Sequence, residues 1–323
     1  MKVCGPPNLV ISGQAVLTLG RADDTAIEGA IWYNKLLQKV QYTGLGNGTW
    51  SAGGAMITAR RALAGAGTQN AALAFGGITG PTEVACTEEY NGNTWSAGGA
   101  MITARSSLAG AGTQNAGLAF GGIVSPTVVA CTEEYNESSW STGGALITAR
   151  QGLAGAGIQN SALAFGGRDI YSSIVSCTEE YNGSSWSAGG ALITASLGLA
   201  GAGTQNAALA FGGRTPATVA CTEEYNGSSW SAGSALITAR RSLAGAGTQN
   251  AGLAFGGDNV TNFLSCTEEY NGLAWSVGGA LITARNQLAG AGTFAKALAF
   301  GGYDGSTVAC TEEYNTVPVI CCF

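Results

Sequence analysis

The segment TARRALAGAGTQNAALAFGG, from Thr58 to Gly77, recurs along this chain with few changes. Each copy is followed by a CTEEYNG segment and then by a segment such as TWSAGGAMIT, and successive copies are 44 to 46 residues apart. Three markers locate the six copies. The FGG triplets end at Gly77, Gly122, Gly167, Gly213, Gly257 and Gly302, the EEY triplets end at Tyr90, Tyr135, Tyr181, Tyr225, Tyr270 and Tyr314, and the tryptophans are Trp50, Trp95, Trp140, Trp186, Trp230 and Trp275.

Each repeat contains four short apolar runs. In the first complete copy we expect strands at Leu63–Thr68, Ala71–Phe75, Val84–Tyr90 and Trp95–Thr103. A period in this range with four strands per unit predicts the blades of a β-propeller. The first strand is almost entirely Ala and Gly, as expected for a strand crowded near the propeller axis. The predicted fold is therefore all-β, a six-bladed propeller over residues 46–315.

The repeat begins out of phase, with the segment that ends every other unit. Trp50 and the residues after it match the segments that follow each EEYNG, whereas no tryptophan follows Tyr314. We therefore predict that Trp50–Ala59 supplies the missing outer strand of the last blade, because such an offset closes a propeller and removes an exposed edge. The alternative is that Trp50 pairs with Val40–Tyr42 and that the last blade recruits Val317–Cys322.

The flanking segments do not match the repeat. In residues 1–45 we expect two strands, Asn8–Leu19 and Ala30–Tyr42, around the polar turn Arg21–Thr25, and we expect residues 316–323 to be a C-terminal tail. The run GAIWYN followed by YTG resembles short β-hairpin modules of phage tail-fibre and other virion surface proteins. This resemblance implies an attachment segment, and the alternative is an ordinary hairpin that covers one propeller edge.

Composition excludes several classes of protein. The chain has 323 residues, 52 glycines at fixed places in the repeats, 11% charged residues, a net charge of −6 and no histidine. The commonest metal ligand and proton shuttle is absent, and the negative charge disfavours a nucleic-acid groove. The N-terminal MKVCGPPN lacks a signal-peptide core, and no apolar run approaches membrane-spanning length. We expect no cofactor, no metal, no nucleic acid, no membrane insertion and no secretion by the general route.

Six of the nine cysteines occupy one equivalent position in successive repeats: Cys86, Cys131, Cys177, Cys221, Cys266 and Cys310. Equivalent positions on neighbouring blades lie too far apart for a disulfide. We therefore predict six buried free thiols, which fits folding in a reducing cytosol. Cys4, Cys321 and Cys322 remain as candidates for a cross-link.

A double glycine after an apolar strand, then a tyrosine, then a tryptophan five residues later is similar to the kelch repeat. The similarity covers Arg60–Asn315, although kelch repeats are usually nearer to about 50 residues. The motif TEEYNG-SSW-SAGG resembles the repeats of kelch-like proteins encoded by marine viruses, especially phages, where such arrays accompany tail and fibre genes. This resemblance implies a location on the virion surface after synthesis in the host cytoplasm.

Comparison of the six copies shows where they differ. The differences concentrate in the loops between second and third strands, here called the variable loops: Ile78–Glu83, Ile123–Val128, Arg168–Ile174, Arg214–Ala217, Asp258–Leu264 and Tyr303–Ser306. They also occur in the blade junctions, which join one blade's fourth strand to the next blade's first strand: Arg61, Ser106-Ser107, Gln151-Gly152, Leu197-Gly198, Arg241-Ser242 and Asn286-Gln287.

In an antiparallel blade both connections emerge on the same side, here called the loop face. A constant scaffold with one varied face is typical of a binding surface. The candidate binding residues are the polar and aromatic members of the variable loops: Arg168, Asp169, Tyr171, Arg214, Asp258, Asn259, Asn262, Phe263, Tyr303 and Asp304. Aromatic stacking and bidentate hydrogen bonds would suit a glycan or a protein.

Charged residues inside the repeats suggest structure more than catalysis. Five repeats begin with arginine, at Arg60, Arg105, Arg150, Arg240 and Arg285, and the fourth has Ser196. Because every repeat also carries a glutamate pair such as Glu88-Glu89, an Arg–Glu ion pair is favoured over an anion-binding ring at the channel mouth. These pairs make up twelve of the 20 acidic residues, so no pair is singled out as acid and base. We predict no catalytic residue.

The predicted function is that of a non-enzymatic virion surface protein, similar to a tail fibre or adhesin. Its loop face would bind a host-surface glycan or protein, and residues 1–45 would bind other virion proteins; a homo-oligomer is compatible with the sequence. The alternative is a cytoplasmic kelch module for protein–protein interaction. A weaker alternative is a glycosidase, because Arg168, Arg214 and Tyr171 partly match the arginine triad and tyrosine of sialidase-like six-bladed enzymes.

Overall fold

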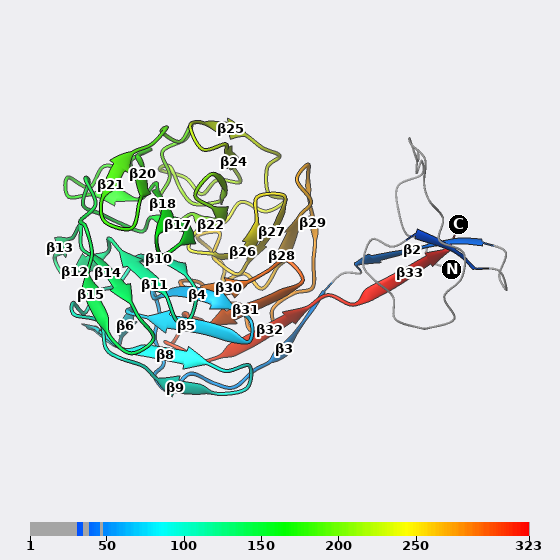
Figure 1. Cartoon of the computed structure of the whole chain (residues 1–323), viewed down its shortest axis with the longest axis horizontal. Helices are drawn as coiled ribbons and strands as arrows, with labels where there is room; N and C mark the ends of the chain where they lie inside the picture. Colours follow the sequence, from blue (N-terminus) through cyan, green and yellow to red (C-terminus); the bar gives the residue numbers. More distant parts are fainter. Residues whose placement is uncertain (1–30, 35–38, 46–47, 323) are drawn as a thin grey trace. The chain divides into compact units, whose positions relative to one another are not determined.

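The computed structural model describes residues 31–34, 39–45 and 48–322, which belong to two compact units. The larger unit is Thr49–Asn315, and the smaller one combines segments from both ends of the chain. In the larger unit, six four-stranded antiparallel sheets are arranged in a ring (Figure 1). The part of the chain that the structure describes contains no helix. The predicted all-β, six-bladed propeller is confirmed.

Each blade runs from an innermost to an outermost strand. The innermost strands are β4 (Ala64–Thr68), β10 (Ala109–Gly112), β17 (Ala154–Ile158), β22 (Ala200–Thr204), β26 (Ala244–Thr248) and β30 (Ala289–Gly292). The second strands are β5 (Ala71–Phe75), β11 (Gly117–Phe120), β18 (Ser161–Phe165), β23 (Ala207–Phe211), β27 (Ala251–Phe255) and β31 (Lys296–Phe300). The third strands are β8 (Thr87–Tyr90), β14 (Thr132–Tyr135), β20 (Thr178–Tyr181), β24 (Thr222–Tyr225), β28 (Thr267–Tyr270) and β32 (Thr311–Asn315). The outermost strands are β9 (Trp95–Ala97), β15 (Trp140–Thr142), β21 (Trp186–Ala188), β25 (Trp230–Ala232), β29 (Trp275–Val277) and β3 (Thr49–Ala52).

The ring closes without a gap, because the innermost strands contact one another in order and β30 contacts β4. The close approach explains their Ala and Gly residues. A Cβ atom added at Gly65 would lie 2.9 Å from the carbonyl oxygen of Gly290 on the neighbouring strand and 2.5 Å from the ring of Phe300. The small residues near the axis are therefore a packing requirement.

The last blade is completed by the first strand of the propeller, as predicted. β3 pairs antiparallel with β32, so that Trp50 lies opposite Tyr314. The alternative pairing of Trp50 with Val40–Tyr42 is wrong. The two segments that it assigned elsewhere, Val40–Tyr42 and Val317–Cys322, contribute to strands that pair with each other instead.

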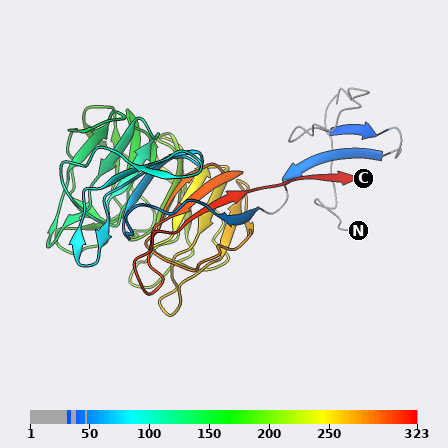
Figure 2. The same ribbon diagram turned by 90° about the horizontal axis from the view of Figure 1, so that it is seen from below.

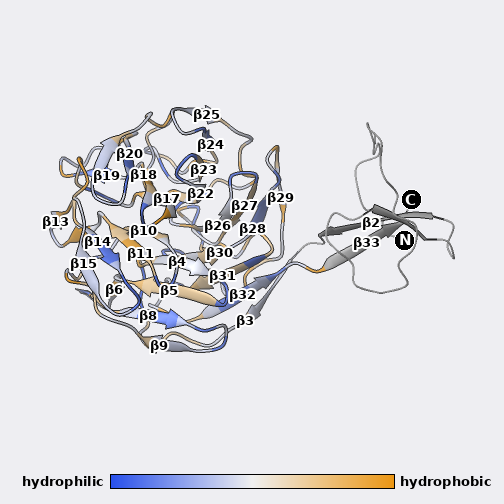
Figure 3. Cartoon of the chain, viewed as in Figure 1, coloured by the Kyte–Doolittle hydropathy of each residue, from blue (hydrophilic) through white to orange (hydrophobic). Residues whose placement is uncertain are grey.

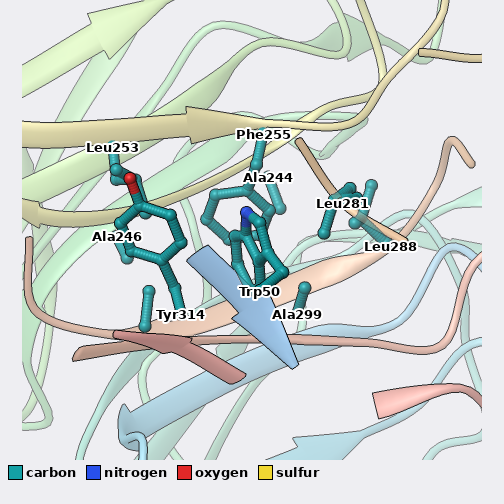
Figure 4. Close-up of a cluster of buried hydrophobic side chains, with 10 residues drawn as sticks. Trp50, Ala244, Ala246, Leu253, Phe255, Leu281, Leu288, Ala299 and Tyr314 are labelled. Atoms are coloured by element: carbon teal, nitrogen blue, oxygen red, sulfur yellow. The ribbon is translucent and has the colours of Figure 1, made fainter. Parts of the chain in front are cut away.

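The cores lie between adjacent blades. In one of them, Trp50 of β3 packs between Phe255 and Tyr314, with ring centroids 5.0 Å from each (Figure 4). The second strands are almost entirely buried, and β5 and β11 are accordingly hydrophobic, whereas β8 and β14 carry the Glu pairs and are hydrophilic (Figure 3). Six such clusters, each shared by two blades, hold the ring together.

The same polar contacts recur at the blade boundaries. The indole nitrogen of Trp50 donates to Thr267 Oγ1 of the preceding blade at 2.9 Å, and each of the other five tryptophans makes the equivalent bond. The hydroxyl of Tyr90 donates to Glu313 Oε1 at 2.6 Å, again across a boundary. Because these groups are buried or half-buried, the bonds satisfy polar atoms that burial would otherwise leave unpaired.

The predicted Arg–Glu ion pairs are confirmed in all five blades that have the arginine. Arg60 and Glu88 lie 3.1 Å apart, and the arginine side chain is fully buried. The other pairs are Arg105–Glu133, Arg150–Glu179, Arg240–Glu268 and Arg285–Glu312. Burial lowers the pKa of the Arg60 guanidinium, and Glu88 opposes that shift. These arginines are thus inside the blades and are not available as a ring at the channel mouth.

The third and fourth strands are shorter than predicted. The expected Val84–Tyr90 begins only at Thr87, and the expected Trp95–Thr103 ends at Ala97. The double glycine after Ala97 explains the early end, because a Cβ atom added at Gly99 would lie 2.0 Å from the carbonyl oxygen of Ser138 in the next blade. The chain leaves the sheet here to pack against its neighbour.

The smaller unit contains one three-stranded sheet, in which β1 (Ile31–Asn34), β2 (Lys39–Leu45) and β33 (Pro318–Cys322) lie side by side (Figure 2). The single strand expected at Ala30–Tyr42 is therefore wrong, because its two runs rich in aromatic and β-branched residues form separate antiparallel strands. The expected C-terminal tail instead contributes β33 to this sheet. The expected strand Asn8–Leu19 and turn Arg21–Thr25 lie outside the described residues.

The six repeated cysteines are free, as predicted, but their predicted burial is wrong. Five are half-buried and Cys221 is exposed, because they lie before the third strand begins rather than within the sheet. Cys221 differs because its blade has Ser196 in place of the arginine, and a small cavity lined by Ser196, Cys221 and Glu223 takes the place of the guanidinium. The side chains of Cys4, Cys321 and Cys322 lie outside the described residues.

Candidate functional site

The structure brings the variable loops and the blade junctions together, one pair per blade. In each blade the first residue of the variable loop pairs with the first residue of the junction. The pairs are Arg61 with Ile78, Ser106 with Ile123, Gln151 with Arg168, Leu197 with Arg214, Arg241 with Asp258, and Asn286 with Tyr303. In the third blade this pairing forms the short strands β16 (Arg150–Gln151) and β19 (Arg168–Asp169). The first two variable loops form two-residue hairpins of their own: β6 (Ile78–Thr79) with β7 (Thr82–Glu83), and β12 (Ile123–Val124) with β13 (Thr127–Val128).

The next residue of every junction belongs to a closed ring of backbone hydrogen bonds. The Ala62 amide donates to the Gln287 carbonyl at 2.8 Å, and each amide in turn donates to the carbonyl of the preceding blade. The six members are Ala62, Ser107, Gly152, Gly198, Ser242 and Gln287, and all six have positive φ angles, between 51° and 66°. Four of them are not glycine, so this ring holds a backbone conformation that is costly for ordinary residues.

All six ring residues line a cavity of about 370 Å³ on the loop face. The rest of its lining is not six-fold symmetric. The first and second blades contribute only ring residues, whereas the other four also contribute the paired residues beside the ring. At the first position of the variable loops, Arg168, Arg214 and Asp258 reach the cavity, and Ile78 and Ile123 do not. The charged side chains of this cavity therefore all come from the third, fourth and fifth blades.

The acidic side of the cavity is already paired. The Arg241 Nε atom donates to Asp258 Oδ1 at 2.9 Å, and Asn286 Nδ2 donates to Asp258 Oδ2 at 2.7 Å. Both oxygens of this nearly buried carboxylate thus have partners. Arg168 and Arg214, by contrast, have no ion pair and no side-chain hydrogen bond among the described residues, and the Nε atom of Arg168 is buried.

Four of the predicted binding residues shape the turns of the variable loops, among them Asp258, which accepts from the Val260 amide at 3.0 Å. Asp169 Oδ1 accepts hydrogen bonds from the amides of Tyr171 at 2.9 Å and Ser173 at 2.8 Å. Asn259 and Asp304 cap their own loops in the same manner. These bonds hold local backbone and leave less capacity for a ligand. The side chain of Asn262 is exposed and donates to Thr261 Oγ1.

The predicted aromatic residues fall into two groups. Tyr171 is 81% exposed and does not line the cavity. Phe263 and Tyr303 contact each other edge to face across two blades, with centroids 5.7 Å apart, and the Arg61 guanidinium lies 4.8 Å from the Tyr303 ring centroid. Arg61, Phe263 and Tyr303, here called the aromatic cluster, form a second feature of the loop face.

The sequence predicted three of the charged residues that line the cavity, but Arg241 and Asn286 were not predicted as site residues. Both lie in blade junctions that differ between the six repeats, and this difference could have identified them. Of the three residues named for the glycosidase alternative, Arg168 and Arg214 line the cavity and Tyr171 does not.

The described residues contain no group of three Cys, Asp or Glu side chains that could hold a metal ion. They also contain no helix with the length and apolar character needed to cross a bilayer.

Comparison with known proteins supports the fold. No family model and no curated protein matches this sequence. Among solved structures, one titled "Structure of YjhT" is similar, with a TM-score of 0.69 and 12% sequence identity. The match covers 83% of this chain and 100% of that one. At this identity the similarity concerns the propeller fold alone.

Proposed function

We propose that this chain is a non-enzymatic, kelch-type binding protein of a virion surface. Its loop face attaches the particle to a host-surface glycan, and residues 1–45 bind other virion proteins. The observation that carries this proposal is the contrast between the blades, which repeat nearly identical internal contacts, and the loop face, whose residues differ around one cavity. Variation confined to one face of a rigid scaffold is the usual arrangement of a recognition surface.

The carboxylates support binding over acid–base catalysis. Asp258 is the one carboxylate lining the cavity among the described residues, and Arg241 and Asn286 occupy both of its oxygens. In the repeated pairs, Glu88 is bound by Arg60 and by backbone amides, and Glu89 accepts from the Tyr135 hydroxyl. A general acid or base must be free to exchange a proton with a substrate.

The size and chemistry of the loop face suit a sugar. A cavity of about 370 Å³ lies in the range of small-ligand sites and holds a ring of hydroxyl, amide and guanidinium groups. Elsewhere in the variable loops, the exposed Tyr171 and the aromatic cluster offer ring faces of the kind that stack on the C–H face of a pyranose. Polar groups for hydroxyls together with aromatic faces for the ring are what glycan recognition requires.

A glycan array probed with the full chain tests this proposal. We expect binding to a subset of surface polysaccharides, and we expect the double variant Tyr171→Ala/Phe263→Ala to lose most of that signal. The matched control is Leu273→Ala, which removes an equally exposed apolar side chain from the loop between the third and fourth strands, on the opposite face. If the array signal depended on Leu273 and not on Tyr171 and Phe263, the glycan would bind the face opposite to the loop face, and our assignment of the face would be wrong. A complete lack of glycan binding would contradict the proposal.

A second candidate function is a protein-interaction module, which the exposed apolar residues of the variable loops favour. Ile170 is 57% exposed, Tyr171 81% and Val260 66%. Aromatic and aliphatic anchors of this kind dominate the energetics of protein interfaces. Mass spectrometry of purified virions separates the two candidates. We expect the chain among the particle proteins, and its absence together with a negative array would leave the interaction module as the better assignment.

A further inference from the structure

We propose that the cavity on the loop face is an anion-binding subsite, in which Arg168 and Arg214 hold the carboxylate or sulfate group of one acidic sugar. The inference deepens the proposed function and rests on it for the sugar, whereas the anion site itself rests on the cavity. These two arginines come from adjacent blades, and no ion pair or side-chain hydrogen bond among the described residues gives them a structural role.

Arg168 and Arg214 lack the ion-pair partners that the buried arginines of the propeller have. Elsewhere in the propeller every buried arginine is matched by a glutamate, as in Arg60–Glu88. Arg168 and Arg214 are half-buried, and neither guanidinium group has an ion pair or a side-chain hydrogen bond among the described residues. The N–H groups that these two side chains direct to the cavity are therefore available to bind an oxyanion.

The side chains that line the cavity carry a net positive charge. Its lining contains three arginines and one aspartate, so positive charge is in excess by two. Because the aspartate forms its ion pair with Arg241, the charges of Arg168 and Arg214 are not balanced by any acidic residue of the lining. This positive site lies in a chain whose net charge is −6. A long polyanion such as a nucleic acid would be repelled by the rest of the surface, whereas a single anionic group in the cavity would not.

The uncharged polar side chains of the cavity suit the sugar ring that would carry the anionic group. Besides the arginines, the lining offers hydroxyl and amide groups from Ser107, Gln151, Ser242 and Gln287. These groups can donate and accept hydrogen bonds, as the hydroxyls of one sugar ring require. Guanidinium groups bind carboxylates and sulfates through paired, charge-assisted hydrogen bonds, which gives the anion a fixed orientation. One acidic monosaccharide therefore matches both the volume and the donors.

Titration calorimetry on the full chain provides the test, with D-glucuronate, D-glucose 6-sulfate and neutral D-glucose as probes. We expect one or both acidic sugars to bind, with affinity that falls as salt is added, and glucose to bind at least about tenfold more weakly. The two acidic probes distinguish a carboxylate from a sulfate ligand. Equal binding of glucose and both acidic sugars, or no binding of either acidic sugar, would overturn the proposal.

The double variant Arg168→Gln/Arg214→Gln keeps hydrogen-bonding side chains and removes the charges. We expect at least a tenfold loss of affinity for the acidic sugar, by analogy with the loss of two charge-assisted bonds. The control is Lys296→Gln, which removes an exposed cation at the opposite end of the blade. Unchanged thermal midpoints would show that both variants fold. Full binding of the acidic sugar by the arginine variant would refute the assignment.

The same variants distinguish this inference from the proposed function. If array binding survives Arg168→Gln/Arg214→Gln and is lost in Tyr171→Ala/Phe263→Ala, glycan attachment stands and the anion subsite is wrong. If the chain binds no glycan on the array but binds D-glucuronate through the two arginines, the anion subsite stands and the attachment function is wrong.

Discussion

At the scale of single residues, the fourth blade is informative because one residue breaks the repeat. Ser196 stands where five blades have arginine, and the carboxylate of Glu223 is buried without a cation. Its oxygens still accept from the amides of Ile193 and Thr194. The fourth blade folds like the others, so these two backbone hydrogen bonds suffice to hold the Glu223 carboxylate in place. In the other five blades the arginine therefore binds a carboxylate that the backbone already positions.

The variant Ser196→Arg should therefore stabilise the protein. The new side chain would find the same acceptors as its counterparts, including the carbonyl oxygens of Gly212 and Cys221, together with the Glu223 carboxylate. Because the carboxylate is already desolvated, we expect a gain of about 1–3 kcal/mol, seen as a higher thermal midpoint. The matched variant Arg150→Ser should lower the midpoint, since it leaves the buried Glu179 carboxylate without its cation and with only its backbone hydrogen bonds. A lower midpoint for Ser196→Arg would mean that the fourth blade has lost the space for a guanidinium.

Trp186 and Tyr171 lie close in the sequence and should respond oppositely to replacement by alanine. Trp186 is 7% exposed, packs 5.0 Å from Phe120 and donates to Thr132 Oγ1. Its loss should destabilise the propeller by about 3–5 kcal/mol in chemical denaturation. Tyr171, at 81% exposure, should cost less than about 0.5 kcal/mol. Comparable losses for the two variants would contradict the division between boundary core and loop face.

At the scale of elements, β3 joins the two ends of the propeller. It has only four residues, yet it covers the edge of β32 and places Trp50 in the core shared with the fifth blade. An uncovered β32 would expose a row of unpaired backbone groups and one side of this core. The closure thus depends on a strand that is distant in sequence from everything it contacts.

Two truncated chains test the contribution of β3. The chain 49–315 retains the whole propeller, and the chain 53–315 lacks only β3. We expect 49–315 to be a monomer with a sharp thermal transition, and we expect 53–315 to melt at a lower temperature and to self-associate through its open edge. Size-exclusion chromatography with calorimetry measures both properties. Identical melting and size for the two chains would show that the last blade is stable without its outer strand.

At the scale of the whole molecule, an internal repeat made most of the fold predictable. Six copies of the FGG, EEY and Trp markers defined the blades, and the offset of Trp50 from Tyr314 defined the closure. The cavity was less predictable, because it depends on which first loop residues reach the axis. Arg168 and Arg214 do so and Tyr303 does not, and a difference of this kind follows from packing across blades, which sequence comparison does not reveal.

The tyrosines at five of the blade boundaries share a raised pKa, which links the stability of the propeller to pH. Burial, followed by the hydrogen bond to a glutamate of the preceding blade, raises the pKa of five boundary tyrosines to about 12: Tyr90, Tyr135, Tyr181, Tyr225 and Tyr270. In the unfolded chain a tyrosine has a pKa of about 10. The neutral form is therefore favoured by folding at every one of these boundaries.

The sign of the effect follows from linkage. Because the folded pKa is raised, the stabilising contribution is complete below about pH 10 and is lost as the pH rises from about 10 towards 12. We expect the thermal midpoint to fall increasingly steeply above about pH 10, since several tyrosines contribute together. The double variant Tyr135→Phe/Tyr225→Phe should melt lower at neutral pH, where it lacks two Tyr–Glu bonds, and its midpoint should fall less steeply in alkali. Differential scanning calorimetry across this range measures both slopes. If the two slopes were equal, the alkaline loss of stability would have to come from groups other than the boundary tyrosines, and the Tyr–Glu bonds would not couple the ring to pH.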